Sequence, residues 1–258
     1  MRALLLAGGL GTRLRPVTDS LPKCLVPIQG RPLLDYWFDL LLPAGFERIL
    51  VNTSYLPEQV RAHVAASAWR DRVDLVHEDV LLGTGGTVLA NRDWFGNGPF
   101  LVAHADNLTD FDAAALARAH AARPAGCAIT MLAFRTDAPQ LCGILELDGG
   151  GIVRAFHEKS PDPPGNLANA AVYVFEPEVV ARIAALGKPV VDLSTEVIPG
   201  FIGRILAVEH HGYHRDIGNV ASLALANREF VPGVAPQRGG LIGQARPPVS
   251  HDNMFRVS

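Results

Sequence analysis

Apolar strand-length runs alternate with helix-length segments through the first half of this 258-residue chain, and no other feature restricts its fold so strongly. Residues 3–6 are apolar throughout and are followed by glycines, as expected of a central strand buried on both faces. A helix is expected from Pro32 to about Leu42. Such alternation is typical of βα units on a mostly parallel sheet. The other strands expected in this half are 49–51, 73–76, 100–103 and a run ending at Phe134, with helices after Pro57, after the loop 83–86 and up to Ala122, the last capped by Asp110 or Asp112.

The second half of the chain departs from this alternation. Residues 144–147 and 152–157 flank the sequence Asp148-Gly149-Gly150-Gly151, which is a hairpin signal, so the sheet is expected to become mixed. Further strands are expected at 170–175 and 205–209, and further helices at 177–186 and 219–230. We therefore expect one α/β domain over residues 1–230, with helices on both faces of its sheet. Pro, Gly, Gln and Ser dominate from Val231 onward, which predicts a C-terminal tail at 231–258.

The composition is that of an ordinary globular protein, with 48% hydrophobic residues and 23 basic against 26 acidic residues. The formal net charge of −3 predicts no general attraction to nucleic acid or to an anionic membrane surface. No apolar run approaches the roughly 20 residues of a membrane-spanning helix. The three cysteines lack the spacing of a zinc site or a disulfide framework, so we expect a reducing, cytoplasmic location. Any phosphate that this protein binds must be held by a local site.

The stretch from residue 4 to residue 23, LLLAGGLGTRLRPVTDSLPK, is the clearest candidate for such a site. It does not fit the dinucleotide-binding fingerprint, because Leu14 stands where the third glycine should be. It is not a P-loop either, because no Gly-Lys-Ser or Gly-Lys-Thr follows the glycines. What remains is a glycine turn whose backbone N–H groups can surround phosphate oxygens. Arg13 suits bidentate contact with a phosphate, and Lys23 is expected to act as a mobile point charge.

The sequence A-G-G-x-G-T-R-L-x-P-x-T, followed by Pro22-Lys23, resembles the signature of the sugar-1-phosphate nucleotidyltransferases. Further elements occur in the order of that family, namely Gly83-Thr84-Gly85-Gly86-Thr87, Asp106, Glu158-Lys159, Asn169-Ala170 and Asp216-Ile217-Gly218. The resemblance spans about residues 1–230. It implies a Rossmann-like nucleotidyltransferase fold, dependence on Mg²⁺, and transfer of a nucleoside monophosphate to a sugar 1-phosphate with release of pyrophosphate.

The resemblance also implies roles for individual residues. Catalytic roles fall to Arg13, Lys23 and Asp106. The sugar phosphate would contact Gly143, Glu158, Lys159 and Asn169, and the metal would contact Asp106 and Asp216. The nucleotide would contact Leu6, Ala7, Gly8, Gly9, Gly11, Thr12, Arg13, Gly83 and Thr84. The second pKa of a sugar phosphate is about 6, so the group is already anionic near neutral pH. This chemistry therefore needs cations more than a general base.

The positions of Asp106 and Asp216 favour a metal site on independent grounds. Asp106 follows the strand 100–103, at the edge where open α/β sheets bind ligands, and Asp216 lies between a strand and a helix. Two carboxylates that converge there could bind Mg²⁺, which prefers oxygen ligands. Each aspartate alone could equally be a helix cap or part of a surface turn.

Three departures from the family pattern lie on the sugar side: Cys142-Gly143 replaces Tyr-Gly, Ser160 follows Glu158-Lys159 in place of Pro, and Ala171 replaces Gly. Asn219 also replaces the commoner Thr. A metal site at His210, His211 and His214 is disfavoured, because alternation along a strand sends the first two to opposite faces. Cys24 is expected to be a small buried hydrophobe.

The resemblance favours GTP as the nucleoside triphosphate and mannose 1-phosphate or D-glycero-D-manno-heptose 1-phosphate as the sugar. The alternatives are a uridylyltransferase for a sugar such as N-acetylmuramate 1-phosphate, and a non-catalytic subunit that binds nucleotide sugars. A NAD-linked dehydrogenase is disfavoured by the missing third glycine. The sequence leaves a homo-oligomer open.

Overall fold

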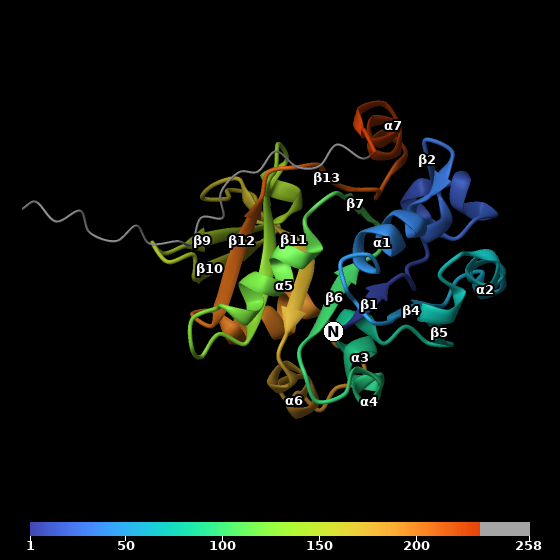
Figure 1. Cartoon of the computed structure of the whole chain (residues 1–258). Helices are drawn as coiled ribbons and strands as arrows, with labels where there is room; N and C mark the ends of the chain where they lie inside the picture. Colours follow the sequence, from blue (N-terminus) through green and yellow to red (C-terminus); the bar gives the residue numbers. More distant parts are fainter. Residues whose placement is uncertain (233–258) are drawn as a thin grey trace, which may run out of the picture.

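Helices cover both faces of a nine-stranded sheet in the computed structural model, which describes residues 1–232 (Figure 1). The hydrogen-bonded order is β10-β9-β11-β6-β1-β4-β5, and β8 pairs with both β11 and β12. The strands of this sheet are β1 (Arg2–Leu6), β4 (Ile49–Thr53), β5 (Val73–His77), β6 (Phe100–His104), β8 (Ile129–Arg135), β9 (Gly143–Leu147), β10 (Val153–Glu158), β11 (Leu167–Phe175) and β12 (Ile205–His210). The predicted α/β class with a central, mostly parallel sheet that becomes mixed is confirmed.

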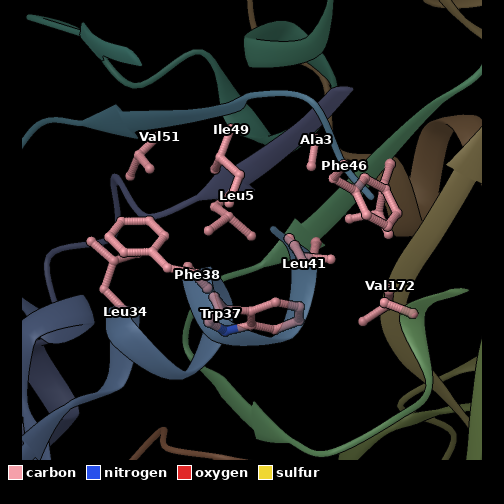
Figure 2. Close-up of a cluster of buried hydrophobic side chains, with 14 of the residues drawn as sticks. Ala3, Leu5, Leu34, Trp37, Phe38, Leu41, Phe46, Ile49, Val51 and Val172 are labelled. Atoms are coloured by element: carbon pink, nitrogen blue, oxygen red, sulfur yellow. The ribbon is translucent and has the colours of Figure 1, made fainter. Parts of the chain in front are cut away.

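The amino-terminal half forms the parallel part of the sheet. β1 pairs in parallel with β4 and β6, and β4 pairs in parallel with β5. Side chains of β1 alternate between two hydrophobic cores, which explains why every position from residue 3 to residue 6 is apolar. Ala3 and Leu5 pack against Trp37 and Phe38 on one face (Figure 2), whereas Leu4 packs into the core on the other face.

The helices divide between these two cores. The core that contains Ala3 and Leu5 is covered by α1 (Leu33–Leu41), α2 (Pro57–Ala66) and α5 (Ala113–Ala121). The opposite core is covered by α3 (Gly83–Ala90), α4 (Arg92–Phe95) and α6 (Pro177–Ala185). Asp112, one of the two predicted caps of α5, accepts a hydrogen bond from the backbone N–H of Ala115 at 2.7 Å.

The carboxyl-terminal half makes the sheet mixed. β9 and β10 form the predicted antiparallel hairpin. β11 is antiparallel to β6 on one side and to β8 on the other, and β12 returns parallel to β8. The last helix, α7 (Val220–Glu229), is capped by Asn219, which accepts from the N–H of Ser222 at 2.8 Å.

A third, smaller core lies between two short β-ribbons and α7. One ribbon pairs β2 (Pro27–Ile28) with β3 (Arg31–Pro32). The other pairs β7 (Asn107–Thr109) with β13 (His214–Asp216), and Figure 1 shows it below α7. The buried residues of this core are Leu14, Val26, Ile28, Leu33, Leu108, Ile217, Ala226 and Phe230. They come from segments that also carry Arg13, Asp106 and Asp216, so this core supports the candidate site.

One sequence prediction about the fold is wrong. Residues 83–86 are not a loop, because they form the first turn of α3. The backbone N–H groups of Gly85 and Gly86 donate to the carbonyl of Val191, which fixes the turn against a distant segment. The predicted tail lies outside the described residues, apart from Val231 and Pro232 at its start. Among residues 1–232, no helix has the length and apolar character needed to cross a membrane.

Candidate active site

The glycine turn follows β1 directly and presents free backbone donors. Leu6 ends the strand, and the next N–H, that of Ala7, donates to the side-chain Oδ1 of Asn52 at 2.7 Å. From Gly8 to Gly11, no backbone N–H has a hydrogen-bond partner among residues 1–232. Unpaired N–H groups that converge in a turn are the donors that a phosphate requires. The predicted phosphate-binding character of Gly8, Gly9 and Gly11 is therefore consistent with this turn.

Two close approaches explain glycines in this turn. A Cβ on Gly8 would lie 2.9 Å from Nδ2 of Asn52, and one on Gly11 would lie 2.9 Å from Cγ2 of Thr18. Gly11 also has a positive φ of 64°. Asn52, only 3% exposed, is a residue that the sequence analysis missed. A polar residue within an otherwise apolar strand was the signal that could have revealed it.

Lys23 lies between the two predicted metal ligands. Its Nζ is 2.5 Å from Oδ2 of Asp106 and 3.4 Å from Oδ1 of Asp216. The side chain belongs to a short 3-10 turn and the residue is only 8% exposed. Burial and two carboxylates hold the ammonium in one place in this structure, so the expected mobility of Lys23 is not seen here.

Pairing of β7 with β13 brings the two carboxylates together. Asn107, next to Asp106, is the register partner of Asp216, and the N–H of Ile217 donates to the carbonyl of Asp106 at 2.9 Å. Arg13 reaches the same place. A Cβ on Gly218 would lie 2.5 Å from Oδ2 of Asp216 and 3.2 Å from Nη2 of Arg13, so this glycine leaves room for both groups. The structure thus gathers Arg13, Lys23, Asp106 and Asp216, as the sequence predicted.

The cluster combines two carboxylates with the positive charges of Lys23 and Arg13. Partial burial raises the pKa of Asp216 above its usual value, and the nearby Asp106 adds to this effect while Lys23 opposes it. For Asp106, burial acts to raise the pKa, but Lys23 and His104 outweigh it and the pKa lies below its usual value. The Asp216 side chain is 54% exposed, so the cluster is open on that side. The two carboxylates attract further positive charge from this open side, against the repulsion of Lys23 and Arg13.

Two carboxylates are suitable ligands for Mg²⁺, but they are too few to hold a metal ion without ligands from outside the protein. Mg²⁺ is commonly bound through one or two carboxylates while phosphates and water supply the other ligands. Within residues 1–232, no group of three or more His, Cys, Asp or Glu side chains could hold a metal ion. His210 is buried with its Nε2 3.0 Å from Oδ1 of Asp110, whereas His211 is exposed. Asp106 and Asp216 consequently fit a metal that arrives with a phosphate ligand.

The start of α3 lies near this region and is tightly supported. Gly83 has a positive φ of 74°, and a Cβ there would meet the carbonyl oxygen of Val191 at 2.5 Å. The hydroxyl of Thr84 accepts from the N–H of Leu193 at 2.8 Å. Gly83 and Thr84 remain half-buried, whereas Gly85 and Gly86 are buried. Of the glycine-rich motif, only its first two residues are thus accessible to a ligand.

A buried carboxylate beneath α3 was also missed by the sequence analysis. Glu78, 6% exposed, follows β5, and its Oε1 accepts from the hydroxyl of Thr87 at 2.6 Å. Its Oε2 is buried and has no hydrogen-bond partner in the described part of the chain. A buried carboxylate oxygen without a donor is costly, so it marks a position where a ligand donor would be favourable.

The residues predicted for the sugar phosphate form a second group on β10, β9 and β11. Glu158 pairs with Gly143, where a Cβ would lie 2.6 Å from the Glu158 Oε2, so the glycine makes room for this carboxylate. Nζ of Lys159 is 3.6 Å from Oε1 of Glu158. Asn169 donates to the hydroxyl of Tyr173 at 2.7 Å and accepts from the N–H of Ala171 at 2.9 Å. The Asn169 amide is thereby fixed in orientation.

The surroundings of Cys24 and Cys142 do not favour a catalytic role for either thiol. Burial raises the pKa of the Cys24 thiol to about 12, as suits the predicted small buried hydrophobe. Burial also raises the pKa of Cys142; Thr136 opposes this, and the carboxylates of Asp216 and Glu158 add to it. Cys142 therefore lies within the electrostatic influence of both groups of site residues.

The sequence pattern of the family described as nucleotidyl transferase matches residues 2–231. This chain belongs to the nucleotidyl transferase family. Its relatives include a mannose-1-phosphate guanylyltransferase from Mycobacterium tuberculosis, 34% identical over 91% of this chain and 66% of the relative. They also include a glucose-1-phosphate thymidylyltransferase from Streptomyces griseus, 30% identical over 95% of this chain and 70% of that protein.

A solved structure supports the fold of this family member. The crystal structure of HddC from Yersinia pseudotuberculosis complexed with GMP-PN has a TM-score of 0.74 and 24% identity, and covers 89% of this chain and 99% of that one. This chain spans less than two thirds of several relatives, including 59% of the mannose-1-phosphate guanylyltransferase catalytic subunit beta of Drosophila melanogaster.

Proposed function

We propose that residues 1–230 form a nucleotidyltransferase domain that transfers a nucleoside monophosphate to a sugar 1-phosphate and releases pyrophosphate. The observation that carries this proposal is the convergence of Arg13, Lys23, Asp106 and Asp216 beside a turn of free backbone N–H groups. Two mutually repelling anions must be brought together in this reaction, so positioned cations are its main requirement. The named activities of the relatives support the same reaction class.

The residues divide the work as follows. The N–H groups of residues 8–11 bind phosphate oxygens of the triphosphate, with Leu6, Ala7 and Thr12 framing the turn. Arg13 neutralises charge that develops on the leaving pyrophosphate. Asp106 and Asp216 would hold Mg²⁺, which when bound supplies positive charge to the phosphates. No side chain has to remove a proton, because the attacking sugar phosphate is already anionic near neutral pH.

The sugar 1-phosphate is assigned to the group around β9 and β10. Lys159 is 68% exposed at its side chain and suits the phosphate of this substrate. Glu158 and the fixed amide of Asn169 suit sugar hydroxyls, and Gly143 keeps the space beside Glu158 open. We propose a mannose or D-glycero-D-manno-heptose 1-phosphate, since a relative that matches most of this chain acts on mannose 1-phosphate by name.

GTP is the proposed donor, and Glu78 is the specific observation that favours it. A carboxylate can only accept hydrogen bonds, and guanine offers two adjacent donors at N1 and N2. Uracil and thymine offer one donor, at N3, beside two acceptors. With the base against Gly83 and Thr84, the Oε2 of Glu78, which is buried in this structure, would accept from guanine once the start of α3 moves to expose it.

A matrix of nucleotides and sugars tests the proposal directly. GTP, UTP, dTTP, CTP and ATP are combined with the 1-phosphates of mannose, heptose, glucose and N-acetylmuramate, and pyrophosphate release is measured with Mg²⁺ and with EDTA. We expect an EDTA-sensitive signal for GTP with mannose or heptose 1-phosphate. The thymidylyltransferase relative makes dTTP with glucose 1-phosphate the second candidate. Silence with every pair, together with retained nucleotide binding, would contradict catalysis and favour a binding subunit.

A further inference from the structure

The ammonium of Lys23 lies where the proposed metal ligands converge. Its Nζ contacts Oδ2 of Asp106 and Oδ1 of Asp216, at 2.5 and 3.4 Å. We infer that Lys23 acts as a resident cation that keeps a divalent metal out of this site until a triphosphate draws the ammonium away. The inference rests on the proposed function, and it makes metal binding dependent on nucleotide binding.

The position of Lys23 is fixed by its surroundings. Its backbone begins the 3-10 turn Lys23–Leu25, and the N–H of Val26 donates to its carbonyl at 3.1 Å. A Cβ on Gly11 would lie 3.4 Å from Cβ of Lys23, so the stem of this side chain packs against the glycine turn. These contacts restrain the backbone, so we expect the ammonium to relocate by rotation of its own side chain.

Electrostatics sets the competition between the ammonium and a metal. A divalent ion held by Asp106 and Asp216 would compete with Lys23 for the carboxylate oxygens to which its ammonium donates. Like charges at such short range repel strongly, even at the effective dielectric constant of a partly buried site. Expulsion of the ammonium without a new partner would leave a buried charge unpaired, which is costly. A metal alone therefore binds against two opposing effects.

A triphosphate removes both of these effects. Its oxygens bind at the N–H groups of residues 8–11, beside the stem of Lys23, and offer the ammonium a new anionic partner. The two carboxylates are then free for the metal, whose other ligands come with the nucleotide. This is a coupling between two binding events, and it acts in both directions. The opposite reading is that Lys23 only aligns the carboxylates, in which case its removal leaves metal affinity unchanged or lowers it.

A titration of the full chain with Mn²⁺, without nucleotide or sugar, distinguishes these two hypotheses. Electron paramagnetic resonance measures the free ion. The variants are Lys23→Met, which keeps the stem and removes the charge, and Lys23→Arg, which keeps a charge. We expect Lys23→Met to bind Mn²⁺ about tenfold or more tightly than the wild type, and Lys23→Arg to bind it as weakly as the wild type does. Adding Asp216→Asn to Lys23→Met should remove the gain, which locates the ion between the carboxylates.

Equal or weaker Mn²⁺ binding by Lys23→Met would overturn the inference. Circular dichroism shows whether this variant folds, since it leaves two carboxylates without their cation. If Lys23→Met does not fold, the wild type and Lys23→Arg decide. Micromolar Mn²⁺ affinity in either protein without nucleotide would overturn the inference, whereas weak binding in both supports the inference. This measurement uses no substrate. A lack of transferase activity would therefore contradict the proposed function without changing the Mn²⁺ result.

Discussion

The backbone N–H of Ile217 donates to the carbonyl oxygen of Asp106 at 2.9 Å, which joins the two segments that carry the candidate metal ligands. Ile217 also enters the small third core together with Leu14, the neighbour of Arg13. Arg13, Asp106 and Asp216 are therefore each one or two residues from a side chain in a common apolar core. Packing in this core should set the separation of the charges above it.

Phe230→Ala tests this dependence. Phe230 closes the third core, is 4% exposed and packs edge-on against Tyr36 and Tyr213, with ring centroids 5.3 Å apart in each pair. Its truncation should lower the free energy of unfolding by about 3–5 kcal/mol and lower kcat/KM at temperatures where the protein is still folded. Ile183→Ala, in the core beneath α6, is the matched control, with a cost of about 2–5 kcal/mol and unchanged kinetics. Equal kinetic losses in both variants would contradict the positioning role.

Glu78→Gln tests the proposed choice of base. The amide keeps the shape of the side chain but replaces one acceptor with a donor, which would face the guanine donors at N1 and N2. The ratio of kcat/KM for GTP to that for dTTP should fall by about tenfold or more, with an unpaired buried group as the reason. Steady-state kinetics with both nucleotides measures the ratio. Thr87→Val removes the other partner of Glu78 and serves as a control for altered packing. An unchanged ratio in Glu78→Gln would show that Glu78 does not read the base.

Ala171→Gly should stabilise the protein. Ala171 has a positive φ of 53°, which an L side chain adopts at a cost, and the strand pairing between β11 and β8 is irregular there. Relief of this strain should raise the free energy of unfolding by about 1 kcal/mol. The greater flexibility that glycine gives the unfolded chain offsets part of this gain. Urea unfolding measures the change. Ala170→Gly, at a buried position without a positive φ, should destabilise instead. A loss of stability in both variants would refute the strain at Ala171.

His120 should make stability depend on pH. Burial lowers the pKa of His120, the nearby Arg123 adds to this effect, and Glu176 opposes it, with a net decrease. The unfolded chain, with a pKa of about 6.5 at this residue, then binds a proton more readily than the folded chain. Stability is fully present above about pH 6.5 and falls below it, by at most about 1.4 kcal/mol per pH unit for this group. His120→Gln should weaken the decrease between pH 7.5 and 5.5 in urea unfolding, and an identical decrease would exclude His120 as a cause.

Local patterns were sufficient to predict most elements and the charged cluster. The apolar run of β1, the cap Asp112 and the hairpin glycines act within a few residues of their effect. The convergence of Asp106 with Asp216 was also predicted, although it arises from the ribbon of β7 and β13 and not from strand ends of the main sheet.

The remaining features depend on contacts between distant segments. Residues 83–86 become helical because Val191 accepts from Gly85 and Gly86, more than a hundred positions away in the chain. The burial of Lys23 follows from its two carboxylate partners, and no local signal distinguishes a buried lysine from a mobile one. Glu78 was missed because its partner Thr87 belongs to another element, whereas Asn52, which accepts from Ala7, could have been noticed from its own polarity.

The fate of labelled phosphorus in GTP tests the central claim most directly. GTP carrying the label in its α-phosphate or in its γ-phosphate is incubated with Mg²⁺ and the sugar 1-phosphate that gives the strongest signal. We expect the α label in a nucleotide sugar and the γ label in pyrophosphate, and Asp106→Ala, still folded, should reduce both by about 100-fold or more. Asp93→Ala, at an exposed aspartate, should leave the yield unchanged. Transfer of the γ label to the sugar, or equal yields from Asp106→Ala and the wild type, would contradict the account.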